Sequence, residues 1–263
     1  MTEKTYRRAG KGQIKRFAKL QLKKYREKEG LFLAEGLRTT LELIAHLPDE
    51  GCLTALFVEP DQLHNIPDRK RLRDKIFLID PAEGHRLSGT STAQGVIGVF
   101  CQLTGTASFE NEKRSLVIAL DNVQDPGNVG TIVRTAAWFG VSAIVCGPGT
   151  ADRYNPKAVR AGAGSVFCVR HYGTGNLRQE LEQMRQRGYS ICCSSLDGTD
   201  FREYDKWPDR MVLVIGNEAN GVKKEIMEIA DRHVAIPHGQ AEPGVESLNA
   251  AVSAAILMAR LVL

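Results

Sequence analysis

A strand, a glycine-containing turn and a helix follow one another in residues 116–139, and this order constrains the fold more than any other feature. Residues 116–120 are a short aliphatic run, which is typical of a buried strand. Pro126-Gly127 then favours a tight turn, because proline fixes φ and glycine permits positive φ. From Thr131 the apolar residues recur with helical spacing. The stretch therefore predicts the first βα unit of an α/β domain.

The start of this predicted helix suits a polar ligand. The first N–H groups of a helix have no partner within it, so they attract anionic or polar groups. Arg134 lies in the first turns, although a cation is favoured at the opposite end of a helix. This position indicates that Arg134 is placed for a ligand. The alternative from the local pattern is a surface loop with a solvated arginine.

The remainder of the chain continues the alternation of strands and helices. Beyond residue 115 we expect strands at 116–120, 143–145, 166–169, 190–194, 211–215 and 233–236, and helices at 130–139, 156–163, 175–187, 221–229 and 248–262. Aliphatic strands that alternate with helices predict a mainly parallel α/β sheet with helices on both faces.

A smaller α/β domain is predicted before it, in residues 1–103. Its expected elements are a flexible arm at 1–12, helices at 14–29, 37–46 and 84–91, strands at 31–34, 53–58, 76–79 and 96–100, and a polar connection at 59–75. Residues 104–114 are polar and without pattern, so we expect a linker there and a second domain over 115–263.

Positive charge is concentrated at the N-terminus. The first thirty residues hold eleven Lys and Arg against three Glu, so the local charge is +8 while the whole chain carries +4. Basic segments of this kind attract nucleic-acid phosphates, although a solvated helix face is the common alternative. The candidate RNA-contacting cations are Lys15, Arg16, Lys19, Lys23, Lys24, Arg26 and Arg38. A second basic cluster lies in residues 69–75.

The cysteines and the hydropathy pattern indicate a cytoplasmic protein. The six cysteines form no Cys-x-x-Cys pair, so we expect reduced, mostly buried thiols and no metal site. No apolar run of membrane-spanning length exists, and the N-terminus has no apolar signal segment. We therefore expect no membrane association.

The last predicted helix, 248–262, is apolar on nearly all sides. Ser247 is a suitable N-cap for it, and small residues within it allow close approach of another helix. Such a helix lies either in the core of one monomer or against a second subunit, so a homodimer through the C-terminal domain is one of the two predictions.

Two further polar loops follow predicted strands, at 216–221 and 237–249. Ligands of α/β proteins bind beyond the carboxyl ends of strands, so these loops and residues 121–130 are expected to share one site. In this order the loops resemble the SpoU branch, or TrmH family, of the SPOUT RNA methyltransferases. The residues that carry the resemblance are Asp125–Gly130 with Arg134, Gly216–Glu218, Ile236-Pro237 with Ser247–Asn249, and Asp152–Lys157 with Arg160-Ala161.

The first domain resembles the ribosomal-protein-L30-like substrate-binding domain of the same family, through its basic helix and Phe32–Gly36. The resemblance implies a SPOUT fold with a deep C-terminal trefoil knot and a homodimer. It also implies transfer of a methyl group from S-adenosylmethionine to a ribose 2′-hydroxyl of RNA. One departure is the connection His238–Glu246, which is a few residues longer than the family usually has.

The resemblance also assigns roles to residues. The catalytic set would be Asn128, Arg134, Glu218, Ser247 and Asn249. The cofactor would be held by Ser195, Leu196, Ile215, Gly216, Asn217, Glu218, Ile236, Pro237, Ser247, Leu248 and Asn249. Structural alternatives remain for three of them: a turn residue for Asn128, a helix-start acid for Glu218 and an N-cap for Ser247.

Arg134 has two possible roles in methyl transfer, and it would also contact the RNA. The family proposal is that it activates the hydroxyl, but a guanidinium normally stays protonated. The physically simpler role is to hold the RNA phosphate and orient the 2′-hydroxyl, because positioning supplies most of the rate for an already reactive sulfonium. Both roles predict that Arg134→Ala loses activity with little loss of cofactor binding.

Other functions remain as alternatives. A dehydrogenase or common Rossmann methyltransferase needs a Gly-x-Gly fingerprint, and Gly127–Gly130 lacks that spacing. A non-enzymatic RNA-binding protein with the same fold is the other alternative. For the substrate we favour ribosomal RNA over transfer RNA, because the additional domain indicates a structured RNA.

Overall fold

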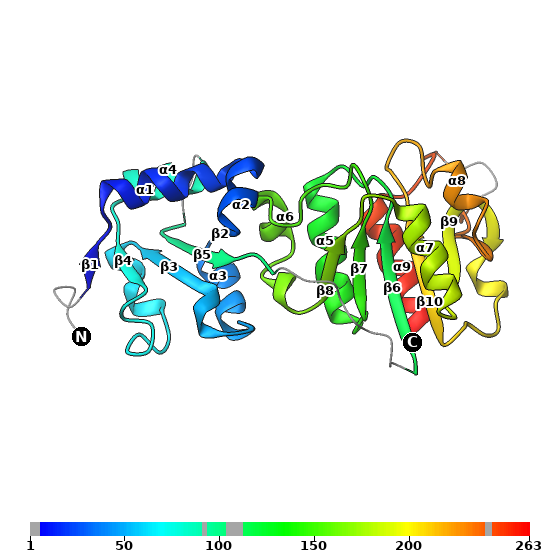
Figure 1. Ribbon diagram of the computed structural model, residues 1–263, viewed down its shortest axis with the longest axis horizontal. Coiled ribbons are helices and arrows are strands. Elements are labelled where there is room, and N and C mark those ends of the chain that lie inside the picture. The colour runs from blue at the N-terminus through cyan, green and yellow to red at the C-terminus, as the bar shows by residue number, and fades with distance from the viewer. Residues whose placement is uncertain (1–5, 91–93, 104–112, 240–243) are drawn as a thin grey trace. The chain divides into compact units, whose positions relative to one another are not determined.

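The chain forms two compact units, each with its own sheet (Figure 1). The structure is a computed structural model that describes residues 6–90, 94–103, 113–239 and 244–263. The first unit consists of residues 1–103 and 152–167, and the second of residues 104–151 and 168–263. The predicted linker lies largely outside the described residues, as do residues 240–243 of the long C-terminal connection.

The first unit has a five-stranded mixed sheet in the order β1-β4-β3-β5-β2. Its strands are β1 (Arg7–Arg8), β2 (Leu31–Glu35), β3 (Leu53–Val58), β4 (Ile76–Leu78) and β5 (Val96–Cys101). Its helices are α1 (Lys11–Ala18), α2 (Lys23–Glu29), α3 (Leu37–Ala45), α4 (Pro81–Ser88) and α6 (Pro156–Ala161), with 3-10 turns η2 (Lys19–Gln21), η3 (Glu50–Cys52), η4 (Pro60–Asn65) and η5 (Ser165–Phe167).

Alternate side chains of these strands enter two cores on opposite faces of the sheet, as strand geometry requires. Leu33 and Phe57 pack with α1 and α4 on one face. Phe32 and Leu56 pack with α3 on the other face, where the core is completed by residues from the segment 152–167.

The segment 152–167 belongs to the first unit, although it was predicted to lie in the second domain. The ring of Tyr154 lies 4.7 Å from that of Phe32, and Tyr154 Oη accepts a hydrogen bond from Leu103 N at 2.8 Å. The strand predicted at 166–169 is wrong, because residues 165–167 form η5 and the strand β8 begins at Arg170. Phe167 packs instead against Phe32 and Phe100.

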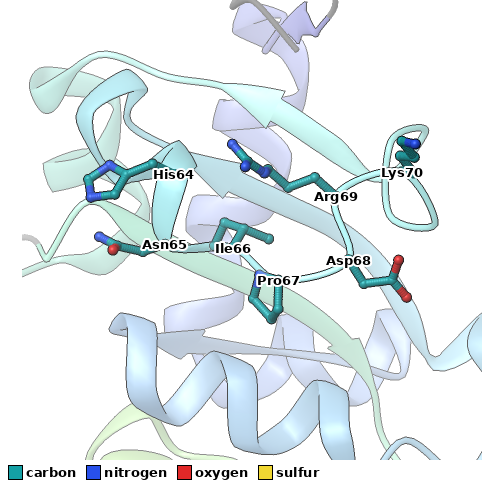
Figure 2. A pocket seen from close by; sticks show the side chains of 7 residues that line it. All are labelled: His64, Asn65, Ile66, Pro67, Asp68, Arg69 and Lys70. Carbon is teal, nitrogen blue, oxygen red and sulfur yellow. The ribbon is translucent and has the colours of Figure 1, made fainter.

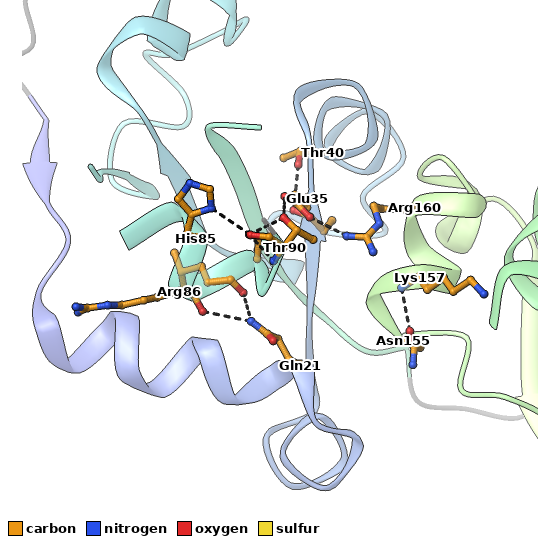
Figure 3. Close-up of polar contacts among 12 residues, drawn as sticks. Gln21, Glu35, Thr40, His85, Arg86, Thr90, Asn155, Lys157 and Arg160 are labelled. Atoms are coloured by element: carbon orange, nitrogen blue, oxygen red, sulfur yellow. Dashed lines mark hydrogen bonds and ion pairs between the residues drawn. The ribbon is translucent and has the colours of Figure 1, made fainter. Parts of the chain in front are cut away.

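A buried polar group joins β2 to this segment (Figure 3). The Glu35 carboxylate accepts hydrogen bonds from Thr90 Oγ1 and from the Arg160 guanidinium, both at 2.8 Å. Two parts of the family resemblance, Phe32–Gly36 and Arg160-Ala161, therefore meet within the first unit.

The helix predicted at 14–29 is interrupted. Leu22 has extended backbone angles between η2 and α2, and the break frees the carbonyl oxygens of Leu20 and Gln21. Arg26 Nη1 donates to both, at 2.8 and 2.7 Å, and so satisfies them. The predicted flexible arm is also wrong for Arg7 and Arg8, which pair with β4 as the short strand β1.

The expectation of reduced cysteines is wrong for one pair. Cys52 and Cys101 form a disulfide, with their Cα atoms 4.7 Å apart. In the antiparallel pair β3–β5, Leu53 lies opposite Phe100, so the next residues outward face each other. Cys192 and Cys193 are free and buried, and burial raises the pKa of both thiols to about 12.

The second unit has a six-stranded sheet in the order β11-β9-β10-β6-β7-β8, with every pair parallel. Its strands are β6 (Ser115–Leu120), β7 (Ala143–Cys146), β8 (Arg170–Gly173), β9 (Ser190–Asp200), β10 (Arg210–Ile215) and β11 (Arg232–Ala235). Its helices are α5 (Pro126–Trp138), α7 (Leu177–Gln186), α8 (Lys224–Met227) and α9 (Ala250–Val262), with the 3-10 turn η6 (Phe201–Glu203).

Helices cover both faces of this sheet, so the predicted α/β class with a mainly parallel sheet is confirmed. Helices α5 and α9 pack together over Ile118 and Leu213, while α7 and α8 pack over Val117 and Val212 on the opposite face (Figure 1). The trefoil knot stays a prediction. Within the described residues, no helix is long and apolar enough to cross a membrane.

Candidate active site

The three loops predicted to share a site follow β6, β10 and β11, and β9, which carries the predicted cofactor residues Ser195 and Leu196, lies between β10 and β11. These four strands are parallel and adjacent in the sheet, so their carboxyl ends lie at one edge. Polar side chains from three of the loops are joined there by hydrogen bonds.

Asn128 is the centre of this hydrogen-bonded group. Its Nδ2 donates to Glu218 Oε1 at 2.8 Å, and its Oδ1 accepts from Asn249 Nδ2 at 2.9 Å. Asn128 is buried, so both ends of its amide are satisfied by protein groups. Three predicted catalytic residues, from three separate motifs, are thus in direct contact.

Glu218 accepts further hydrogen bonds from the loop after β6. The backbone N–H groups of Gln124 and Asp125 donate to its carboxylate, at 3.3 and 3.4 Å. Partial burial alone would raise the pKa of the Glu218 carboxyl, but the hydrogen bonds from Asn128 and backbone N–H groups outweigh it and lower that pKa. Glu218 is therefore held as a carboxylate acceptor.

Helix α5 begins four residues earlier than predicted, which places Asn128 in its first turn rather than in a loop. Asp125 caps the helix, because its Oδ1 accepts from Gly127 N at 2.7 Å, and Pro126 suits the first helical position. Arg134 lies two turns further along α5 and is exposed. It is not part of the hydrogen-bonded group around Asn128.

The Asn217 side chain shapes the loop after β10. Its Oδ1 accepts from Ala219 N at 2.9 Å, and its Nδ2 donates to the Asn122 carbonyl oxygen at 2.8 Å. Asn217 and Gly221 exchange two backbone hydrogen bonds of 2.9 Å. A Cβ atom on Gly216 would collide with the backbone of Gly221 and Val222, so the tight return of this loop requires glycine.

Ser195 and Leu196 lie on a large bulge of β9, which extends beyond its predicted end at residue 194. Cys193 pairs with His233 and Thr199 pairs with Val234, so five residues of β9 lie between two consecutive positions of β11. Bulges of this kind re-aim side chains next to active sites. Leu196 is 65% exposed on the bulge.

The predicted cap of the last helix is wrong. Asn249, not Ser247, caps α9, because its Oδ1 accepts from Ala251 N at 2.9 Å and from Val252 N at 3.3 Å. The helix begins at Ala250, two residues later than predicted, and Ser247 and Leu248 are exposed before it. Asn249 thus uses one end of its amide for the helix and the other for Asn128.

Asp121 and Asn122 were not among the predicted site residues, yet both connect β6 to the loop after β10. Asp121 Oδ2 accepts a hydrogen bond from Lys223 N at 2.8 Å, and the Asn122 carbonyl oxygen accepts one from Asn217 Nδ2. A sequence signal existed, since an acidic residue follows an aliphatic strand directly.

Comparison with known proteins decides the family. The SpoU rRNA methylase family matches residues 115–259, which is more than half of the chain, and the MRM3-like substrate-binding domain matches residues 11–98. This chain belongs to the SpoU rRNA methylase family. The resemblance inferred from the motifs is therefore confirmed.

Individual relatives of this SpoU family member agree over nearly its whole length. It is 32% identical to the Bacillus subtilis 23S rRNA (guanosine(2553)-2′-O)-methyltransferase RlmP, over 93% of this chain and 94% of that protein. A TrmH-family structure from Porphyromonas gingivalis is 31% identical, with a TM-score of 0.80 and coverage of 96% and 98%. An rRNA methyltransferase from Sinorhizobium meliloti with bound AdoMet is 27% identical, with a TM-score of 0.81 and coverage of 94% and 93%.

The loops of this SpoU protein are chemically suited to S-adenosylmethionine. Leu196 and Leu248 are exposed aliphatic side chains on two of the loops, and Ile236 is half-buried on a third. Exposed aliphatic groups beside polar backbone turns suit a purine ring attached to a polar chain. Across the described residues, no group of His, Cys, Asp or Glu is placed to hold a metal ion.

The predicted RNA-contacting cations divide into two classes. Lys15, Arg16, Lys19, Lys23, Lys24 and Arg38 are exposed. Arg26 is only 2% exposed, and its guanidinium donates to Asp152 Oδ2 at 2.8 and 2.6 Å as well as to two carbonyl oxygens. The prediction that Arg26 contacts RNA is therefore wrong, because its donors are used inside the first unit.

The second basic cluster borders a pocket of about 560 Å³ (Figure 2). The pocket is lined by His64, Asn65, Ile66, Pro67, Asp68, Arg69 and Lys70. All of these residues lie in the first unit, and none carries the family motifs. The pocket is therefore separate from the hydrogen-bonded group around Asn128.

Proposed function

We propose that this protein transfers a methyl group from S-adenosylmethionine to a ribose 2′-hydroxyl of ribosomal RNA. The observation that carries the proposal is the hydrogen-bonded group Asn249–Asn128–Glu218, which joins three family motifs at one edge of the sheet. The family and the relatives named above favour ribosomal over transfer RNA.

The residues of the site divide between cofactor and substrate. Bound S-adenosylmethionine supplies an electrophilic methyl group. The loop at Gly216–Glu218, the bulge with Ser195 and Leu196, and Ile236-Pro237 with Ser247–Asn249 hold this cofactor. Asn128 fixes the relative positions of the loops that carry Glu218 and Asn249 through its two hydrogen bonds. Positioning of this kind contributes a large part of the rate.

Arg134 orients the ribose in this proposal. Its guanidinium is exposed on α5, and because a guanidinium offers only N–H donors, it donates to a phosphate or to the 2′-oxygen. The hydroxyl proton then leaves to solvent or to the substrate itself.

The first unit binds the RNA substrate in this proposal. Lys11, Lys15 and Lys19 recur at every fourth position, and Ile14 and Phe17 of the same segment are buried. The lysines therefore share a solvent-facing stripe. Lys19 and Lys24 lie 5.3 and 5.0 Å from the Tyr25 ring, which adds an aromatic surface for an RNA base.

A second copy of the chain is the expected partner of the second unit. Helix α9 buries Ala254, Leu257 and Leu261 in the core, but Val252 is 46% exposed and Ile256 is only half-buried. An apolar face left on a helix is suited to a subunit interface. We therefore propose that this face of α9 forms the homodimer contact. We also propose that the protein is cytoplasmic and that its C-terminal end forms the trefoil knot.

The direct test is methylation with methyl-labelled S-adenosylmethionine. Ribosomal and transfer RNA from a strain that lacks the protein serve as substrates, and the position of the label is mapped. We expect label on a ribose of ribosomal RNA only. Label on transfer RNA alone would make the protein a tRNA methyltransferase. No cofactor binding by calorimetry, with or without RNA, would leave an RNA-binding protein.

A further inference from the structure

Asp121 is a fully buried carboxylate next to the candidate active site. It follows β6 directly, and its side chain has no exposed surface. Burying a carboxylate is costly unless hydrogen bonds or an opposite charge compensate it. The partners of Asp121 therefore show what the residue holds in place.

These partners lie at both ends of the loop after β10, residues 216–222. Asp121 N donates to the carbonyl oxygen of Ile215, the last residue of β10, at 2.9 Å. At the other end of the loop, Asp121 Oδ2 accepts from Lys223 N at 2.8 Å. The residue directly after β6 thus anchors the loop at its entry through its backbone N–H and at its exit through its carboxylate. The side chain of Asp121 is responsible for the exit anchor alone.

The loop between these two anchors has little freedom. Gly216 lies against the backbone of Gly221 and Val222, and Asn217 pairs with Gly221. With both ends and the interior fixed, the position of Glu218 is fixed too. Glu218 is the residue that reaches Asn128.

The charge of Asp121 has its own partner. Asp121 Oδ1 lies 3.6 Å from Lys223 Nζ, which is an ion pair rather than a hydrogen bond, and the Lys223 side chain is 46% exposed. The same lysine therefore supplies the backbone N–H for one carboxylate oxygen and the positive charge for the other.

We propose that Asp121 is a positioning residue, which holds loop 216–222 in the shape that binds the cofactor without touching the cofactor itself. The inference rests on the proposed function, because Gly216, Asn217 and Glu218 of this loop are proposed cofactor residues.

Two variants test it. Asp121→Asn keeps the size of the side chain and one acceptor oxygen but removes the charge, and Asp121→Ala removes both. Isothermal titration with S-adenosylmethionine measures cofactor affinity, and hydrogen exchange of residues 216–223 without cofactor measures how firmly the loop is held. We expect faster exchange in both variants and cofactor binding about tenfold weaker for Asp121→Ala, with a smaller loss for Asp121→Asn.

Ser115→Ala is the matched control. Ser115 is the first residue of β6, at the end of the strand away from Asp121, is buried, and accepts a hydrogen bond from Tyr189 Oη at 3.0 Å. Its loss also removes a buried hydrogen bond from β6, so it lowers the melting temperature. We expect cofactor affinity and exchange of residues 216–223 to stay at wild-type values.

The possible outcomes distinguish a failure of the proposed function from a failure of the inference about Asp121. If the wild-type protein binds no S-adenosylmethionine, the proposed function fails, and the exchange measurement alone decides whether Asp121 holds the loop. Suppose instead that the wild type binds S-adenosylmethionine. If both Asp121 variants then match it in cofactor affinity and in hydrogen exchange of residues 216–223, the inference is overturned. Equal losses in Ser115→Ala and Asp121→Ala would overturn it as well, since they would reflect general destabilisation. Should Asp121→Ala fail to fold, Asp121→Asn decides.

Discussion

Asn128 illustrates how one side chain organises a site. An amide offers a donor and an acceptor in fixed geometry, so Asn128 links a carboxylate on one loop to an amide on another. A carboxylate of the same size lacks the donor, and an aliphatic side chain lacks both functions. The roles of Asn128 and Arg134 are therefore expected to differ: the first shapes the site, and the second acts on the substrate.

Removing the Arg134 guanidinium should separate catalysis from cofactor binding. We expect Arg134→Ala to lower kcat/KM by about a hundredfold or more, while its Kd for S-adenosylmethionine stays within about twofold. Arg134→Lys keeps the charge but not the planar fork, so its activity should be intermediate. Arg185→Ala, on α7, is the control. Near-normal turnover in Arg134→Ala would remove Arg134 from the catalytic set.

Removing the Asn128 amide should change the titration of Glu218. The pKa of this carboxyl is lowered in the fold, so its hydrogen bonds persist above the unfolded pKa and are lost as pH falls through the lower, folded value. In Asn128→Ala the pKa should rise, and the loss should occur at higher pH. Carbon-13 NMR titration of the Glu218 carboxyl measures this. Asn220→Ala, on the same loop, should leave the pKa unchanged, and an unshifted pKa in Asn128→Ala would contradict the proposed contact.

At the scale of elements, most helices and strands were predictable, and the misplaced ones have physical causes. Aliphatic runs such as those of β3, β6 and β10 identified buried strands, because burial on both faces leaves no polar alternation. The break before α2 was not predictable, since it depends on Arg26 and Asp152, which are far apart in sequence. The disulfide likewise follows from the β3–β5 register rather than from cysteine spacing.

Breaking the Arg26–Asp152 ion pair should strongly destabilise the first unit. Asp152→Asn leaves a buried guanidinium without its counter-charge, so we expect the free energy of unfolding to fall by about 3–5 kcal/mol. Lys24→Ala, an exposed neighbour, should change it by less than about 0.5 kcal/mol. Urea unfolding monitored by circular dichroism measures both. Equal stabilities of the two variants would show that the pair contributes little.

At the scale of the whole molecule, the chain passes between its two units more than once, because residues 152–167 join the first unit from within the second. Pattern analysis places a domain boundary where composition changes, and composition does not change at residue 152. The segment is ordinary α/β sequence, and it is assigned by its contacts with the first unit, such as those with Phe32, Arg26 and Glu35.

The basic stripe should determine the salt dependence of RNA binding. Deleting residues 1–28 is unsuitable as a test, because Phe17, Leu20 and Arg26 are part of the core. Replacing the three exposed lysines of the stripe, Lys11, Lys15 and Lys19, together by alanine leaves the core intact. Each lost phosphate contact should reduce the slope of log K against log[salt] by about 0.7–0.9. Filter binding at several salt concentrations measures the slope, with Lys206→Ala as the control. An unchanged slope would show that RNA binds elsewhere.

The apolar face of α9 at Val252 and Ile256 should form the dimer interface, so a charge placed there should change the oligomeric state. Val252→Glu places a charge on the half-exposed apolar face, so burial against a second copy would cost several kcal/mol and weaken the dimer by well over tenfold. Leu22→Glu is the matched control, because Leu22 is an aliphatic side chain with 56% exposure in the first unit. Analytical ultracentrifugation should find a dimer for the wild type and Leu22→Glu and a monomer for Val252→Glu at the same concentration. A monomeric wild type would reject the dimer. A Val252→Glu dimer as tight as the wild type would place the interface away from α9.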